Sequence, residues 1–191
     1  MLLDAFMPGH DFFERHEILV RASPADAYRA IRNVDFGRSF PIAVLLAVRG
    51  LPHFLTRKLP SSRHVTLDYI LQAGFVVLAE AEQSELVLGA VGKFWRLDSG
   101  FVAIRPEDFT AFNTPGYAKA VLNFTAEENS PKGCLVTTET RIVCTDAASK
   151  RKFALYWKLI GPFSGLIRGW ALGLIRADAE ALASARESAS G

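Results

Sequence analysis

The side chain in this sequence best suited to acid–base chemistry is His16, since a neutral imidazole can take or give a proton near pH 7. It lies in an alternating segment, Phe13 to Ala22, which predicts a strand. Residues of one parity share a strand face, so His16 lies on the same apolar side as Ile18 and Val20. A lone inward histidine is more often a core residue whose hydrogen bonds are satisfied, and the sequence shows no obvious partner for it. His16 is therefore the catalytic candidate only if the protein is an enzyme.

Two threonines are the other polar groups expected on that apolar side. Thr138 and Thr140 share the dry parity of the predicted strand from Cys134 to Thr145. Glu139 and Arg141 have the opposite parity. They could form a buried charged pair that orients a ligand, but a cross-strand ladder on a wet sheet face is the favoured interpretation.

Metal and cofactor chemistry find little support in the sequence. The four histidines lack compact metal-ligand spacing, and neither cysteine belongs to a Cys-x-x-Cys pair. The glycines form no phosphate-binding fingerprint, because Gly89, Gly92 and Gly100 fall in a strand-like segment. We therefore expect no metal and no cofactor. The histidines are His10, His16, His53 and His64.

The two cysteines, Cys134 and Cys144, lie ten residues apart in one predicted strand. At about 3.3 Å per residue they are ~33 Å apart, beyond disulfide reach. We expect two free thiols and a reducing compartment. The N-terminus lacks the pattern of a signal peptide, and no apolar run approaches the ~20 residues that span a bilayer. The expected location is cytoplasmic.

Charge is distributed unevenly along the chain. Residues 36–67 and 147–177 hold eleven of the 22 basic residues and none of the 20 acidic ones, and both stretches are apolar. An anionic head group or an anionic membrane surface would attract such segments, and peripheral membrane contact is a predicted interaction. The alternative is that both are core helices whose long basic side chains reach water. No basic run is dense enough to predict nucleic-acid binding. The basic residues that could attract an anion include Arg49, Arg57, Lys58 and Arg168.

The length of 191 residues suits one domain, residues 1–191, with 1–12 as an N-terminal extension and 187–191 as a frayed tail. Ser23 as cap and Pro24 at the first position predict a helix to about Asn33. The apolar run 40–48 predicts a second helix and 53–59 another turn or two. Strands are expected at 75–82, 85–97, 101–105, 118–127 and 134–145.

The C-terminal third is predicted to be helical in two pieces, interrupted at Gly161-Pro162 and ending near Arg186. One apolar stripe at helical spacing is expected to face the sheet throughout. Its members are Phe153, Tyr156, Trp157, Ile160, Phe163, Leu166, Ile167, Trp170 and Leu174.

Strand parity predicts which side chains face this helix. The expected inner face carries no acidic or basic residue in its clear strands and alternates small residues with large ones, which leaves room for a cavity or for close helix packing. A bulge would reverse some assignments. The inner residues include Phe75, Val77, Ala79, Leu86, Leu88, Ala90, Gly92, Phe94, Ala118, Ala120, Leu122 and Phe124, and the outer ones Glu80, Glu82, Lys93, Lys119, Asn123 and Thr125.

The order of elements, with segments 20–28, 91–95, 138–141 and 153–157, resembles the START-like superfamily. This superfamily (SRPBCC) includes birch-pollen-allergen-like and polyketide cyclase-like proteins. The resemblance implies an α+β helix-grip fold: a curved antiparallel sheet around a long C-terminal helix, with two small helices after the first strand. It also implies a cavity for hydrophobic ligands between sheet and helix. No catalytic motif of an enzymatic branch matches residue by residue.

Three functions follow from these observations. The leading hypothesis is non-catalytic binding or transport of a hydrophobic or amphipathic small molecule, lipid or polyketide-like. The first alternative is a small cyclase- or dehydratase-like enzyme that uses His16, which an inward acid–base pair near His16 would favour. The second is an interaction module with a filled core, such as a homodimer. The predicted ligand-binding residues are His16, Phe94, Leu122, Phe124, Thr138, Thr140, Trp157, Phe163 and Trp170.

Overall fold

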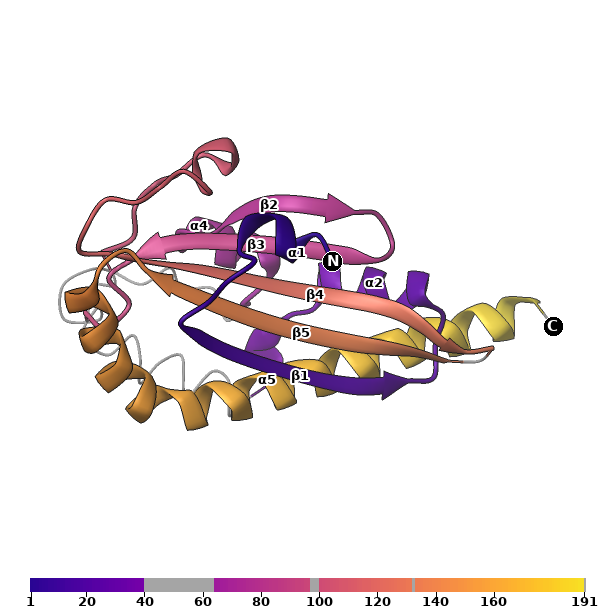
Figure 1. Ribbon diagram of the computed structural model, residues 1–191. Helices are drawn as coiled ribbons and strands as arrows, with labels where there is room; N and C mark the ends of the chain where they lie inside the picture. Colours follow the sequence, from indigo (N-terminus) through magenta and orange to yellow (C-terminus); the bar gives the residue numbers. More distant parts are fainter. Residues whose placement is uncertain (40–63, 97–99, 132, 191) are drawn as a thin grey trace.

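The structure is a computed structural model that describes residues 1–39, 64–96, 100–131 and 133–190. A five-stranded antiparallel sheet, in the order β1-β5-β4-β3-β2, curves against the long helix α5 (Figure 1). This confirms the predicted α+β helix-grip architecture, with small helices after the first strand. The elements are α1 Leu3–Phe6, β1 Phe12–Val20, α2 Pro24–Asn33, η1 Phe36–Arg38, α4 Leu67–Gln72, β2 Val76–Ala81, β3 Glu85–Gly92, η2 Pro106–Asp108, β4 Ala118–Ser130, β5 Gly133–Cys144 and α5 Ala147–Ser190.

Helix α2 begins as its sequence predicts. Ser23 is the N-cap, its hydroxyl oxygen accepts the Asp26 N–H at 3.2 Å, and Pro24 occupies the first turn. The buried Ala27 and Ile31 then face the core shared with α5. Helix α4 was not anticipated. The predicted helices at 40–48 and 53–59, and with them Arg49, Arg57 and Lys58, lie outside the described residues.

The β2–β3 hairpin turns at Gln83, whose φ is +64°. A bulge between Val77 and Ala79 shifts the parity of β2, so the sheet faces assigned to Ala79 and Glu80 were wrong, although Glu80 is exposed as expected. Ala79 packs in the outer cluster, while Glu80 lies toward α2 and accepts a hydrogen bond from the Tyr28 hydroxyl at 2.5 Å. Strand β3 ends at Gly92, and the strand predicted at 101–105 is only an isolated bridge from Val102.

Parity in the central strands is confirmed on the α5 side of the sheet, where Ala118, Ala120, Leu122 and Phe124 pack in the clusters that contact α5. The opposite face is not wet, contrary to expectation: Asn123 and Thr125 are buried there. A second apolar cluster covers it, formed with α1 and the segment around Phe109. Its buried members are Leu3, Met7, Leu78, Val87, Val91, Phe109 and Val121.

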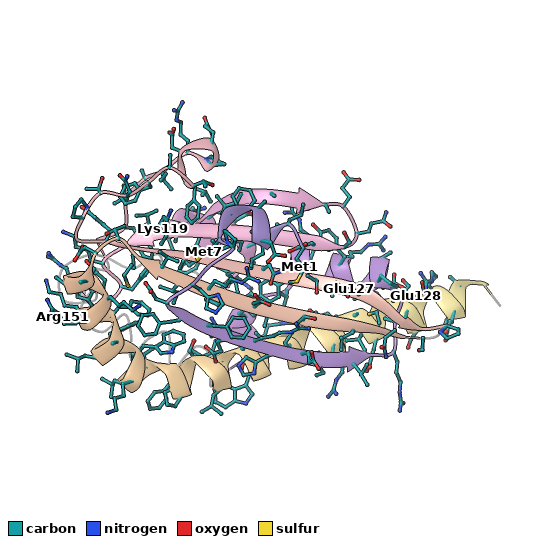
Figure 2. The ribbon with its side chains drawn as sticks, in the orientation of Figure 1. Met1, Met7, Lys119, Glu127, Glu128 and Arg151 are labelled. Atoms are coloured by element: carbon teal, nitrogen blue, oxygen red, sulfur yellow. The ribbon has the colours of Figure 1, made fainter. Side chains whose placement is uncertain are left out.

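The predicted surface ladder of Glu139 and Arg141 is instead a buried pair under the N-terminal segment. The Arg141 Nε donates to Glu139 at 2.6 Å, and Glu139 is 2% exposed. Arg141 also donates to the Met7 carbonyl at 2.7 Å and pairs with Asp4 at 2.8 Å; Figure 2 shows Met7 over the strands. These charges lie on the sheet face away from α5, where the N-terminal segment covers them. They therefore cannot orient a ligand between the sheet and α5.

Helix α5 is continuous from Ala147 to Ser190, so the predicted interruption at Gly161-Pro162 was wrong. Proline removes one intrahelical hydrogen bond and bends a helix, and α5 curves along the sheet in Figure 1. The residues after Arg186 that were expected to fray remain helical as far as Ser190. Among the described helices, none combines the length and apolarity needed to cross a membrane.

Candidate functional site

A row of polar side chains crosses the interface between the sheet and α5. Strands β1 and β5 and helix α5 each carry polar residues at the middle of an otherwise apolar face. In the register of β1 with β5, Glu14 lies opposite Thr140 and His16 lies opposite Thr138. The helix adds Ser164 and Arg168. We call Glu14, His16, Thr138, Thr140, Ser164 and Arg168 the polar band.

Arg168 is the centre of the polar band. Its Nη1 donates to Glu14 Oε2 at 2.6 Å and to the Ser164 hydroxyl, and its Nη2 donates to Thr140 Oγ1 at 2.7 Å. The Glu14 and Arg168 side chains are each 15% exposed. Burial lowers the pKa of the Arg168 guanidinium, and the Glu14 carboxylate opposes that effect. An arginine nevertheless remains protonated, so the site holds a fixed positive charge.

One nitrogen atom of Arg168 makes no hydrogen bond within the described residues. Its Nε is buried and has no hydrogen-bond partner in the part of the chain that the structure describes. A buried donor left unpaired costs about 1–3 kcal/mol. An acceptor atom brought to Nε would remove that penalty.

His16 has the acidic partner that sequence reasoning did not find. Its Nε2 lies 2.9 Å from Glu14 Oε1. A carboxylate only accepts hydrogen bonds, so this contact assigns the proton of a neutral imidazole to Nε2 and leaves the Nδ1 lone pair free to act as a base. The His16 side chain is 33% exposed, so the imidazole is within reach of solvent.

Gly165 lets the helix approach these side chains closely. A β-carbon at this position would lie 3.0 Å from Glu14 Oε1 and 3.5 Å from His16 Cε1. A side chain at this position would therefore crowd the Glu14 carboxylate, whereas its β-carbon would only be in van der Waals contact with His16.

Apolar clusters flank the polar band on both sides. On one side, Phe153 contacts Phe12 with ring centroids 4.8 Å apart and stacks on Trp157 at 5.7 Å. Phe94 contacts the Phe153 ring edge-on, with ring centroids 6.3 Å apart. We call Phe12, Phe94, Phe153 and Trp157 the aromatic cluster. On the other side lies the core that contains Leu122 and the residues Val20, Leu86, Leu88, Phe124, Val136, Leu172 and Ile175.

The structure brings most of the predicted binding residues to this interface. His16, Thr138 and Thr140 are in the polar band, Phe94 and Trp157 in the aromatic cluster, and Leu122 and Phe124 in the opposite core. The Thr138 hydroxyl donates a hydrogen bond to the Asn123 carbonyl at 2.9 Å, so its proton is already used within the sheet. Their roles toward a ligand stay predictions.

Two predicted residues lie elsewhere. Phe163 is 45% exposed and Trp170 38% exposed, on the side of α5 away from the sheet. The expectation that one stripe through both residues faces the sheet was therefore wrong. The inward positions of this part of α5 are Ser164, Arg168 and Leu172.

Sequence reasoning missed Glu14, Ser164, Gly165 and Arg168 as members of the site. Parity alone could have found Glu14, because it lies two residues before His16 on the same strand face, and it corrects the expectation of an uncharged inner face. Arg168 was predicted as a basic residue beside an apolar helix that could attract an anionic head or a membrane, but not as a side chain of the inner face. Its inward direction depends on the rotation of α5, which the sequence did not fix.

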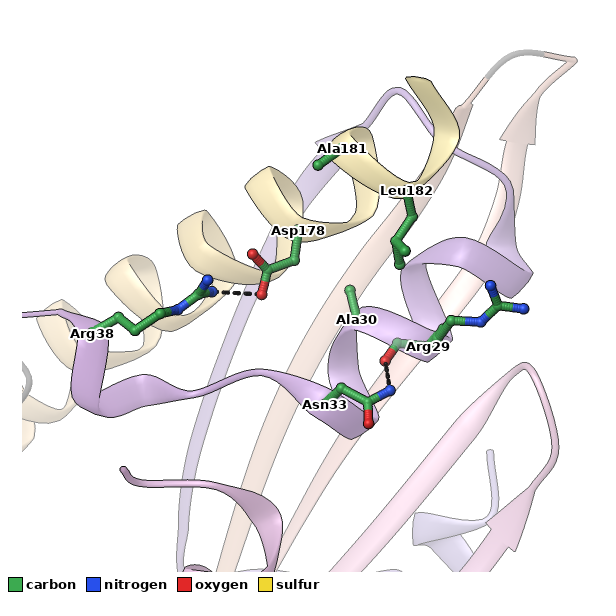
Figure 3. A pocket seen from close by; sticks show the side chains of 7 residues that line it. All are labelled: Arg29, Ala30, Asn33, Arg38, Asp178, Ala181 and Leu182. Atoms are coloured by element: carbon green, nitrogen blue, oxygen red, sulfur yellow. Dashed lines mark hydrogen bonds and ion pairs between the residues drawn. The ribbon is translucent and has the colours of Figure 1, made fainter. Parts of the chain in front are cut away.

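A separate, open pocket of about 400 Å³ lies between α2 and α5 (Figure 3). The Arg38 guanidinium closes one side through its pair with Asp178 at 2.5 Å. The pocket shares no residue with the polar band, so we do not assign it to the same site. Its lining is Arg29, Ala30, Asn33, Arg38, Asp178, Ala181 and Leu182.

No protein-family model matches the chain, and no curated protein matches its sequence. Among solved structures, a hypothetical protein from Helicobacter pylori has a TM-score of 0.45 at 11% identity, covering 91% of this chain and 92% of that one. A truncated norcoclaurine synthase from Thalictrum flavum has a TM-score of 0.38 at 13% identity, covering 90% and 92%. A conserved protein of unknown function from Enterococcus faecalis has 0.37 at 11%, covering 91% and 78%. Similarities this low carry no argument about function.

Proposed function

We propose that the protein binds an amphipathic small molecule, lipid or polyketide-like, between the sheet and α5. The apolar part of the molecule would lie against the aromatic cluster, and an acidic head would accept hydrogen bonds from Arg168. The unpartnered, buried Nε of Arg168 carries this proposal. The START-like superfamily assignment belongs to the same proposal, and the helix-grip arrangement supports it.

The energetics of the site favour such a molecule over a purely apolar one. A hydrogen bond to a charged group is worth about 1.5–3 kcal/mol, because the charge strengthens the bond. Apolar area removed from water adds roughly 25 cal/mol per Å². An acidic head beside an apolar body would use both contributions, since the polar band and the aromatic cluster are adjacent along β1 and α5.

The first test is native mass spectrometry of the purified protein, followed by organic extraction. The second is a titration with naphthalene-2-carboxylate and its uncharged analogue naphthalene-2-carboxamide. Arg168→Gln should weaken carboxylate binding by about 10- to 100-fold, as expected for one lost charge-assisted hydrogen bond. It should change carboxamide binding much less.

Two controls separate binding from folding. Arg168→Gln leaves Glu14 without its cation, so Glu14→Gln/Arg168→Gln removes both charges and should also lose the preference for carboxylate. Arg176→Gln changes an exposed arginine on the same helix and should bind like the wild type. Equal affinity of the wild type for both probes, with no copurified compound, would contradict the proposal.

The Glu14–His16 pair supports a second candidate function, a small enzyme that acts on the bound molecule. His16 Nδ1 would take a proton from a C–H group next to a carbonyl, and Glu14 would stabilise the imidazolium through Nε2. Arg168 would stabilise the negative charge that develops on the carbonyl oxygen. The carbanion would attack a second carbonyl of the same molecule, and the new alkoxide would take the proton back, which is an intramolecular aldol cyclisation.

His16→Ala separates the two functions, since binding does not need a base. Once a copurified compound is identified, the wild type and His16→Ala are compared for binding and for turnover. Lost turnover with retained binding supports the enzyme. Unchanged turnover excludes His16 as an essential base.

A further inference from the structure

We propose that the outer side of α5 binds an anionic lipid bilayer surface. This surface lies on the opposite side of the helix from the polar band and does not depend on the function proposed for that site. Five large apolar side chains line it, and each is exposed to solvent: Leu155 75%, Leu159 68%, Phe163 45%, Leu166 52% and Trp170 38%. We call these five residues the outer stripe.

The spacing of the outer stripe places its members on one helix face. They follow one another at intervals of four, four, three and four residues, the repeat of a helix with 3.6 residues per turn. At 1.5 Å per residue the stripe is about 22 Å long. The inward side of the same helix is also apolar, with Phe153, Leu172 and Ile175 buried. A helix that is apolar on both sides normally has both sides covered, but among the described residues the exposed side of α5 has no apolar partner.

The charged residues beside the outer stripe indicate that its binding partner is anionic. Between residues 147 and 177 there is no acidic residue. Arg151, Lys152 and Lys158 are exposed, and none pairs with an acidic side chain within the described ranges. Arg151 lies near the N-terminal end of α5 in Figure 2. Lys150 is different, because it pairs with Asp11 at 2.6 Å.

An anionic bilayer fits this combination better than a second copy of the chain. Apolar side chains with a tryptophan enter the head-group region, while lysines and arginines bind the anionic heads. Two copies joined through this face would bring the uncompensated basic residues of both chains together. That arrangement costs energy through like-charge repulsion.

The test is flotation of the wild-type protein with vesicles of phosphatidylcholine, with or without 30% phosphatidylglycerol. We expect binding to the anionic vesicles and weakening by 0.5 M NaCl. Each basic residue near an anionic surface is worth about 1 kcal/mol, so Arg151→Gln/Lys152→Gln/Lys158→Gln should weaken binding by roughly 100-fold. Its matched control is Arg15→Gln/Arg21→Gln/Arg29→Gln, which removes three arginines outside α5 and should have a much smaller effect.

The apolar contribution has its own variant and control. Leu155→Gln/Leu159→Gln/Leu166→Gln should weaken binding about tenfold or more, because these side chains would enter the interface. Phe13→Gln/Leu19→Gln, which changes residues of β1 that are 46% and 62% exposed, should not. Brominated lipid should quench part of the tryptophan emission, and Trp170→Phe should remove that part.

Three results would overturn the proposal. One is the absence of binding to anionic vesicles, and another is equal binding to vesicles with and without anionic lipid. The third is a dimer in sedimentation that the triple leucine variant dissociates while vesicles remain unbound, which would assign the outer stripe to a second copy of the chain.

Discussion

Replacing Arg168 alone should destabilise the fold about as much as replacing Arg168 and Glu14 together. The Arg168→Gln variant leaves the Glu14 carboxylate at 15% exposure without its cation. An uncompensated charge in a partly dry site is costly, whereas a neutral pair of glutamines keeps hydrogen-bonding capacity without charge. The measurement is a double-mutant cycle on the free energy of unfolding.

The structure sets the magnitude. With 2.6 Å between Arg168 Nη1 and Glu14 Oε2, the Coulomb attraction is about 6 kcal/mol at an effective dielectric constant of 20. Desolvation of both groups offsets most of it. We expect losses of about 3 kcal/mol for Arg168→Gln, about 2 kcal/mol for Glu14→Gln and about 3 kcal/mol for the double variant. The coupling energy is then about 2 kcal/mol, within the range for contacting residues.

Equilibrium unfolding in urea at pH 7 measures all four proteins, provided that the slope with denaturant stays constant. The matched control is the cycle of Glu17 with Arg168. Glu17 lies on the other face of β1, its side chain is 56% exposed, and it pairs with Arg15 instead. That cycle should be additive. A coupling below about 0.5 kcal/mol for Glu14 with Arg168 would refute the pairing on which the polar band depends.

Three further predictions test the fold around the site. Gly89→Ala would place a β-carbon 2.6 Å from the Leu78 side chain and should cost about 1–3 kcal/mol in urea unfolding, whereas Gly173→Ala, with open space around it, should stabilise by up to about 1 kcal/mol. Hydrogen bonds from Ser149 and Gly116 N–H groups hold the pKa of Asp146 well below its usual value. The contribution of the Asp146 carboxylate to the free energy of unfolding is therefore present above about pH 4 and is lost as pH falls through the folded pKa. The difference in unfolding free energy between the wild type and Asp146→Ala should therefore shrink from about pH 5 to about pH 2, and a constant difference would contradict this assignment. Burial, with a smaller contribution from Asp11, raises the pKa of Cys144 to about 12, so alkylation by iodoacetamide at pH 8 should be at least about 100-fold slower in the folded than in the unfolded protein.

Local signals predicted those parts of the fold that local interactions determine. The Ser23 cap and Pro24 fix the start of α2 through contacts within three residues. Parity placed the side chains of β4 and β5 on the α5 side because both strands are long and paired on both edges. A single bulge in β2 was enough to defeat the same reasoning at Ala79 and Glu80, since one extra residue exchanges the two faces.

The buried charges on the outer sheet face depend on a contact that parity cannot show. Glu139 and Arg141 share the parity that was expected to face solvent, and Arg141 is covered by contacts from the N-terminal segment. That segment docks through Glu85, which accepts the Leu2 N–H at 2.7 Å, and through Arg141, which binds the Met7 carbonyl. The two ends of this contact are more than 80 residues apart, so no local pattern predicts it.

Helix α5 explains why the site itself was only partly predictable. Its apolar residues satisfy helical spacing on two opposite sides, so the sequence allows two rotations of the helix against the sheet. The rotation chosen from the sequence directed Phe163 and Trp170 inward. In the structure, Ser164 and Arg168 face the sheet instead.

The positions of the charged residues would have distinguished the two rotations of α5 against the sheet. Glu14 shares the inner face of β1 with His16, and a carboxylate at 15% exposure needs a cation. Arg168 is a basic residue of the acid-free stretch 147–177 of α5, and the rotation of the helix that brings Arg168 to Glu14 turns the outer stripe toward solvent. The buried ion pair and the exposed apolar stripe are therefore two consequences of one helix rotation. A variant that removes the pair without loosening α5 would show that apolar packing alone sets this rotation.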